Sequence, residues 1–152
     1  MFSGLLLIHS ALRYVALLLI LTAIFRSLSG WLGKRPYTPA DRKVSLFTVI
    51  TVHTQLVIGL ILYFQSTWVK AGLADMGAAM KDKLLRFWTV EHISMMVIAI
   101  VLITIGSVSA KKAPTDLAKH KRTTILFILA LLLILASIPW PFMATGVGRS
   151  WI

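Results

Sequence analysis

The sequence contains no cysteine, and only 14% of its residues are charged. The lack of cysteine excludes disulfides, thiolate metal ligands, iron–sulfur clusters, thiol catalysis and covalently attached haem. Soluble domains are about half apolar and about one quarter charged, whereas this chain of 152 residues is 58% hydrophobic. A soluble fold of this length cannot bury so much apolar surface. The composition therefore indicates an integral membrane protein.

Acidic residues are also scarce, with 5 Asp and Glu against 16 Lys and Arg and a net charge of +11. In a soluble protein this excess would suggest nucleic-acid binding. Here the basic residues lie in short connections between apolar runs, and no basic helix carries interleaved aromatic residues. We therefore expect them to set membrane topology, and we expect no nucleic-acid partner.

Four apolar stretches reach the length of about 20 residues that a helix needs to cross a bilayer. They cover residues 4–25, 44–64, 87–108 and 123–142. None alternates in the manner of a barrel strand. The first lacks a basic n-region and an A-x-A site, so we expect it to be retained as a helix. The sequence predicts an all-α membrane protein, with residues 1–152 forming one four-transmembrane-helix bundle.

The basic residues are distributed unevenly between the two ends of this predicted bundle. Ten lie in or beside the first and third connections, and five lie at the opposite end. The ten are Arg26, Lys34, Arg35, Arg42, Lys43, Lys111, Lys112, Lys119, Lys121 and Arg122, and the five are Lys70, Lys81, Lys83, Arg86 and Arg149. By the positive-inside rule, both termini face the periplasm from a bacterial inner membrane. The outer segment 66–86 is expected to form a short helix along the surface.

Ionisable side chains within the apolar stretches are costly, and each is a functional hypothesis. His9 and His92 each follow the outer end of their stretch by five residues, about 7 Å of helix, and so lie at matching depth. Arg13 lies one turn below His9 on the same helix face. His53 is near the middle of the second stretch. His120 is next to the fourth stretch, at the opposite surface.

Two imidazoles at one depth on different helices suit the axial positions of a haem iron. We expect His9 and His92 as the first ligand pair. Arg13 and Arg86 would then neutralise propionates, and Glu91 would orient an imidazole or carry a proton. The alternatives to a haem site are purely structural roles: a histidine that hydrogen-bonds a neighbouring helix and an Arg13–Glu91 ion pair.

Other polar residues favour simpler interpretations. Thr48, Thr51 and Gln55 form a stripe that predicts interhelical hydrogen bonds, although a quinone head group needs similar partners. A zinc or di-metal carboxylate site is disfavoured, because Glu91 is adjacent to His92 and points about 100° away from it. We interpret His120, within the basic run 119–122, as a solvated flank.

Four segments, each with one histidine, resemble a family of small four-helix membrane proteins labelled "cytochrome B". They are 8–14, 53–59, 91–96 and 119–122, and the resemblance covers nearly the whole chain. The layout is more loosely similar to half of a haem A synthase. The resemblance implies non-covalent haem b, with His9, His53, His92 and His120 as candidate ligands, and a role in electron transfer. A second haem would need the pair His53 and His120, which differ in depth by about 13 Å.

The leading hypothesis is therefore a bis-histidine haem b subunit that transfers electrons within the membrane. Its partners would be membrane lipid and other membrane or periplasmic redox subunits, and a homo-oligomer is compatible with this function. The sequence shows no nucleophile–base pair or phosphate loop, so an electron-transfer subunit is favoured over a stand-alone enzyme. The competing hypothesis is a cofactor-free accessory or assembly subunit. A proton-coupled transporter using Glu91 and His92 ranks lowest, because no stretch is broken at mid-depth by Gly or Pro.

Overall fold

The computed structural model describes residues 2–146, and over this range it contains helices and short turns but no strand. Its long helices are α1 (Phe2–Leu32), α2 (Pro39–Gln65), α6 (His92–Lys111) and α7 (Asp116–Ser137). Arg149, one of the five outer basic residues, lies outside the described range. Within this range, four helical segments are long and apolar enough to cross a membrane, which confirms the predicted all-helical class and the four long apolar helices.

The segment between α2 and α6 is helical almost throughout. It contains α3 (Thr67–Ala74), α4 (Met76–Lys81), α5 (Lys83–Arg86) and the π-helix η1 (Phe87–Glu91). The last two continue directly into α6, so one helical segment runs from Lys83 to Lys111. Three short helices therefore replace the single surface helix that was predicted for residues 66–86.

When α6 is counted with the helical segment that begins at Lys83, the long helices extend beyond the predicted apolar stretches, except at the end of α7. That helix begins seven residues before residue 123, because the Thr115 side chain accepts a hydrogen bond from the Ala118 amide and caps it. It ends five residues before residue 142, where Pro139 and Pro141 follow. The predicted limits 123–142 are therefore wrong at both ends, since caps and prolines, and not hydropathy, determine where this helix begins and ends.

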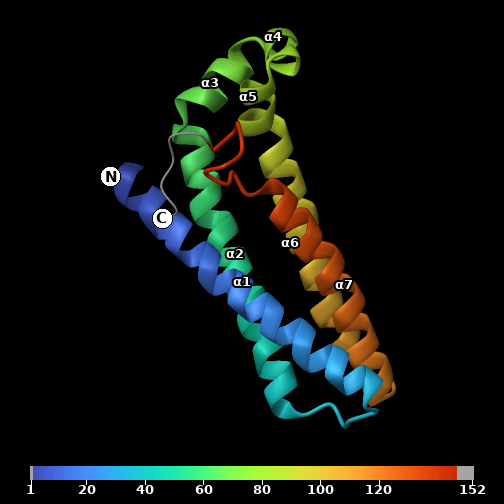
Figure 1. Ribbon diagram of the computed structural model, residues 1–152. Helices are drawn as coiled ribbons and strands as arrows, with labels where there is room; N and C mark the ends of the chain where they lie inside the picture. The colour runs from blue at the N-terminus through green and yellow to red at the C-terminus, as the bar shows by residue number, and fades with distance from the viewer. Residues whose placement is uncertain (1, 147–152) are drawn as a thin grey trace.

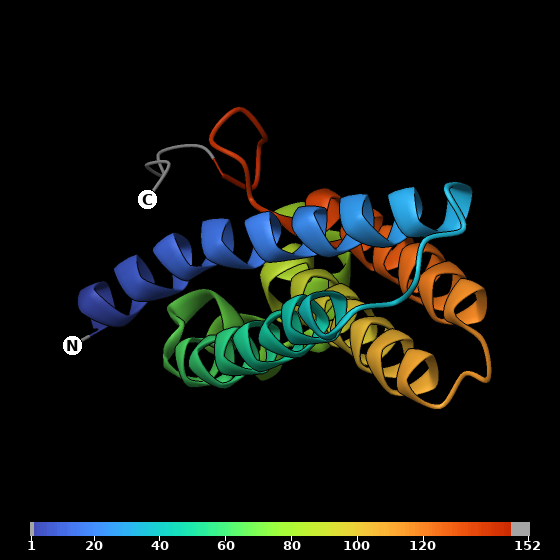
Figure 2. The same cartoon turned by 90° about the horizontal axis from the view of Figure 1, so that it is seen from below.

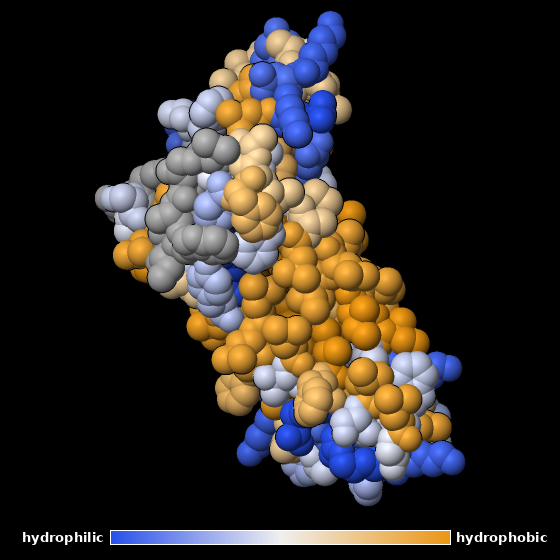
Figure 3. Space-filling view, in the orientation of Figure 1, coloured by the Kyte–Doolittle hydropathy of each residue, from blue (hydrophilic) through white to orange (hydrophobic). Residues whose placement is uncertain are grey.

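Consecutive long helices run antiparallel and form a ring in which α1 packs on α2 and α7, and α6 packs on α7 and α2 (Figures 1 and 2). The α1–α2 and α6–α7 turns lie at one end of this bundle. The N-terminal end of α1, the end of α7 and the short helices α3 to α5 lie toward the other (Figure 1). An apolar belt separates the two more polar ends (Figure 3), as expected of a bundle that crosses a bilayer.

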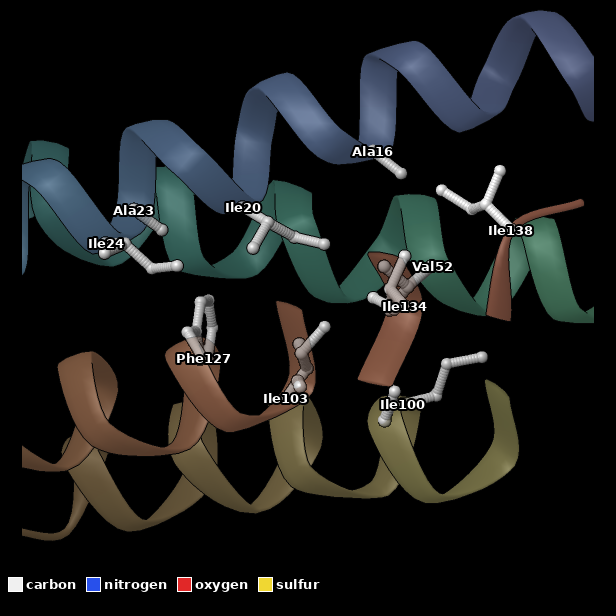
Figure 4. Close-up of a cluster of buried hydrophobic side chains, with 12 residues drawn as sticks. Ala16, Ile20, Ala23, Ile24, Val52, Ile100, Ile103, Phe127, Ile134 and Ile138 are labelled. Atoms are coloured by element: carbon white, nitrogen blue, oxygen red, sulfur yellow. The ribbon is translucent and has the colours of Figure 1, made fainter. Parts of the chain in front are cut away.

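The hydrophobic core lies where α1, α6 and α7 face one another (Figure 4). Ile20, Ile103 and Phe127 are fully buried there. Gly106 allows α6 to approach α7 closely, because a Cβ at this position would lie 3.0 Å from the Phe127 ring. By contrast, Phe25 is 76% exposed on the outer surface, as expected of a side chain that faces lipid.

A buried carboxylate fastens the α1–α2 turn. The Asp41 side chain is 1% exposed and accepts five hydrogen bonds of 2.7–3.0 Å from Arg26, Arg35 and Thr38. The same carboxylate raises the pKa of Arg35 above its ordinary value. Because Arg26 belongs to α1 and Asp41 to α2, this cluster joins the end of one helix to the beginning of the next.

His120 lies in the second turn of α7 and is fully buried. Its Nε2 donates to the Arg35 carbonyl at 3.1 Å. The ring occupies the space that a Cβ on Gly30 would need. The interpretation of His120 as a solvated flank is therefore wrong. Because α7 begins early, His120 shares the buried face of Thr123, Thr124 and Phe127, spaced three, four and seven residues later.

We expect Asp41→Ala to lower the free energy of unfolding in detergent by about 2–3 kcal/mol. This lies below the loss for a fully buried pair, because both guanidinium groups are one-third exposed. Unfolding by SDS titration measures the difference. Asp75→Ala is the matched control, since Asp75 only caps α4 and its loss is expected to cost about 1 kcal/mol. Equal losses in the two variants would contradict the role of the Asp41 cluster.

Candidate functional site

The four long helices enclose a cavity of about 160 Å³ in the half of the bundle nearest α3 to α5. Most of its lining is aliphatic. The polar side chains that line it are His9, Ser10, Arg13, Gln55, Tyr63, Ser66, Trp88 and His92. The structure therefore brings together His9 and His92, the two histidines predicted to lie at one depth.

His92 is oriented by a hydrogen bond to another helix. Its Nδ1 lies 2.8 Å from the Ser137 carbonyl of α7. Since a carbonyl oxygen only accepts, Nδ1 is the donor and carries a proton. The ring centroids of Phe87 and Trp88 lie 5.8 and 5.7 Å from the centroid of the imidazole, and these contacts further restrict its rotation. A histidine that donates one N–H to a main-chain carbonyl has the arrangement typical of a metal ligand.

The Ser137 carbonyl is available because of the prolines that end α7. A helical carbonyl normally accepts from the amide four residues later, but Pro141 has no N–H to offer Ser137. The Leu135 carbonyl likewise lacks a main-chain donor, because residue 139 is proline. The Trp140 indole N–H donates to the Leu135 carbonyl at 3.0 Å instead. The positions of Pro139 and Pro141 in the sequence identify these two carbonyls as the ones that need other donors.

His9 is held differently. Its main-chain carbonyl accepts from Gln55 Nε2 at 2.8 Å, which confirms one interhelical bond of the predicted polar stripe. Its ring lies over Gly59, where an added Cβ would be 3.0 Å from Cε1. The ring atom Nδ1 is buried and has no hydrogen-bond partner among residues 2–146. The imidazoles of His9 and His92 both line the cavity.

The two arginines expected beside the histidines occupy different places. Arg13 lines the cavity, and its guanidinium lies 4.9 Å from the Tyr14 ring and 6.0 Å from the Trp140 ring. Arg86 does not line the cavity, and its Nε donates to Glu91 Oε1 at 2.6 Å. The ion pair that Glu91 makes in the described part of the chain is thus with Arg86, and the alternative Arg13–Glu91 pair is not the one observed.

The remaining histidines lie outside the cavity. His53 is exposed on α2, where its Nδ1 donates to the Val49 carbonyl of the same helix at 2.8 Å. His120 is buried at the opposite end, against the α1–α2 turn. The structure does not bring these two side chains together.

The donor set fits a haem with two axial imidazoles, since His9 and His92 come from different helices and line one cavity, and His9 Nδ1 is buried with no hydrogen-bond partner among the described residues. Residues 2–146 contain no group of three or more His, Cys, Asp or Glu that could hold another metal ion. A cavity of this volume admits about one benzene-sized ring, so a porphyrin requires the lining to open. The N-terminal part of α1 is the least packed part of the four long helices, because residues 3–15 include none that is buried.

Comparisons with protein-family models, with curated proteins and with solved structures find no match for this chain. The geometry and chemistry of its own residues therefore carry the functional interpretation.

We expect Gly59→Ala to displace the His9 ring and to lower the free energy of unfolding by about 1 kcal/mol, because the new methyl group overpacks this contact. Gly4→Ala is the matched control, since nothing lies within 4 Å of a Cβ there. Imidazole ¹⁵N spectra and SDS titration measure the two effects. An unchanged His9 signal in Gly59→Ala would contradict the contact.

Proposed function

We propose that this chain is a haem b subunit of the bacterial inner membrane, related to the small "cytochrome B" proteins. In this proposal, His9 and His92 ligate one haem iron between α1 and α6. The observation that supports it most directly is that two imidazoles from different helices line one cavity, while His92 is bonded through its other nitrogen to Ser137.

Each polar group of the cavity has a defined task in this proposal. The Ser137 carbonyl fixes the ring plane and tautomer of His92 and keeps Nε2 basic. Arg13 offers a charge-assisted hydrogen bond to a propionate. The aliphatic lining excludes water. A haem with two histidine ligands has no open coordination position, so it supplies one-electron transfer.

The location of the site indicates the side on which electrons are exchanged. The cavity lies near α3 to α5, away from the turns that carry most basic residues. With those turns in the cytoplasm, both termini and the haem edge face the periplasm. The partner is then a periplasmic or membrane redox subunit, which includes a second copy of this chain.

The proposal predicts a reduced-minus-oxidised spectrum with sharp α and β bands, and one haem per chain by pyridine haemochrome assay. His9→Ala and His92→Ala should each abolish the six-coordinate spectrum, because each removes one axial ligand. His53→Ala is the matched control, since its ring is exposed on α2, and it should keep the wild-type spectrum.

Three further results decide the outcome. Added imidazole should restore six-coordination to the two alanine variants if they are folded, since it enters the space left by the side chain. A colourless wild-type protein from haem-replete cells would overturn the proposal and favour the cofactor-free accessory subunit. Loss of the spectrum in His53→Ala alone would reject the assigned ligand pair.

The orientation is open to a direct test, because the chain has no cysteine and a single introduced one reports its own location. We expect Gly77→Cys in α4 to react with a membrane-impermeant maleimide on intact spheroplasts. Lys112→Cys in the α6–α7 turn should react only after permeabilisation. Both positions are exposed. The reverse pattern would refute the orientation and leave the ligand assignment untouched.

A further inference from the structure

The helix that carries His92 is interrupted immediately before it. Residues Phe87–Glu91 form a π-helix, and the His92 amide donates to the Phe87 carbonyl five residues earlier. One extra residue in a turn rotates everything beyond it by about 100° relative to an unbroken α-helix. The direction in which His92 leaves the helix, relative to α5, therefore depends on this π-turn.

The ion pair between Arg86 and Glu91 is consistent with the π-turn seen in the main chain. Arg86 Nε and Glu91 Oε1 are 2.6 Å apart, although the two residues are five positions apart. In a regular α-helix, positions five apart are separated by about 140° around the axis. This pair is compatible with the π-turn and not with a continuous α-helix. Both side chains are about one-third exposed, so the pair by itself stabilises the turn weakly.

The middle of the π-turn is held by two neighbouring elements. The Tyr63 hydroxyl of α2 donates to the Thr89 carbonyl at 2.9 Å. Thr89 is 3% exposed. Its side chain lies directly against Gly72 of α3, where a Cβ would overlap it. Thr89 is thus fixed through its carbonyl by α2 and through its side chain by α3.

Such fixation is needed because a π-turn is less favourable than the regular helix into which it can relax. Beyond His92 the helix cannot rotate freely, since Ala99, Ile100 and Ile103 are buried in the core. Relaxation of the turn would therefore be absorbed at its own residues and at His92. The bond to Ser137 and the approach to His9 would both be disturbed.

We propose that Tyr63 is a positioning residue for His92, and that its hydrogen bond to Thr89 maintains the π-turn that directs the imidazole into the cavity. Tyr63 also lines that cavity, but in this role it acts through the main chain. The proposal rests on the proposed function for the identity of His92 as a haem ligand, and on the geometry of the turn for everything else.

The experiment compares Tyr63→Phe with Tyr37→Phe in the full-length, haem-loaded protein. Phenylalanine keeps the ring and removes only the hydroxyl. Tyr37 is the matched control because it lies at the opposite end, beside His120. We expect Tyr63→Phe to shift the g values of the low-spin ferric haem, which report the angle between the imidazole planes. Haem transfer to excess apomyoglobin should become about tenfold faster, the low end of losses seen for outer-shell partners.

The amide exchange of residues 88–92 in haem-free protein provides an independent readout. Loss of one hydrogen bond should speed this exchange about fivefold in Tyr63→Phe. Wild-type g values with only a lower melting temperature would overturn the proposal, because a merely structural residue behaves in this way. Unchanged exchange would also overturn it. If the wild-type protein binds no haem, the proposed function fails, and the exchange experiment still decides whether Tyr63 holds the turn.

Discussion

Main-chain carbonyls inside a membrane need a hydrogen-bond donor. This requirement explains the placement of the polar side chains in the half of the bundle nearest α3 to α5. Regular helices supply their own donors. Where the regular pattern is interrupted, a side chain supplies one. The indole of Trp140 donates to Leu135 and the imidazole of His92 donates to Ser137, the two carbonyls whose helical donors would be prolines. Tyr63 also donates to a main-chain carbonyl, that of Thr89 within the π-turn. The interruptions of the helices thus determine where the polar side chains lie.

The same requirement for hydrogen-bond partners places the histidines in different environments. Three of the four donate to a main-chain carbonyl, but the carbonyls belong to different partners. His53 bonds within its own helix and stays on the outside. His120 bonds the turn after α1 and fastens the bundle at that end. His92 bonds the Ser137 carbonyl of α7, and its ring lines the same cavity as His9. Identical residues therefore perform different tasks because their acceptors differ.

Helix α1 is well packed at its C-terminal end and poorly packed at its N-terminal end. The Asp41 cluster, the buried His120 and the core around Ile20 hold the second half of α1. Residues 3–15 of its first half include none that is buried, and the cavity lies beside them. Segments with few buried contacts open at the lowest free-energy cost, so this end of α1 is where the proposed cofactor would enter.

The sequence by itself determined that the long helices are apolar enough for a membrane, and it determined how many there are. Apolar composition and stretch length directly reflect the free energy of transfer from water into hydrocarbon. The sequence also predicted the shared depth of His9 and His92, since helical rise is constant. Only the tertiary structure decided which faces meet. The burial of His120, the pairing of Arg86 with Glu91 and the π-turn before His92 depend on neighbours far away in the chain. Hydropathy measures the affinity of a residue for the membrane and contains no information about which helix lies beside it.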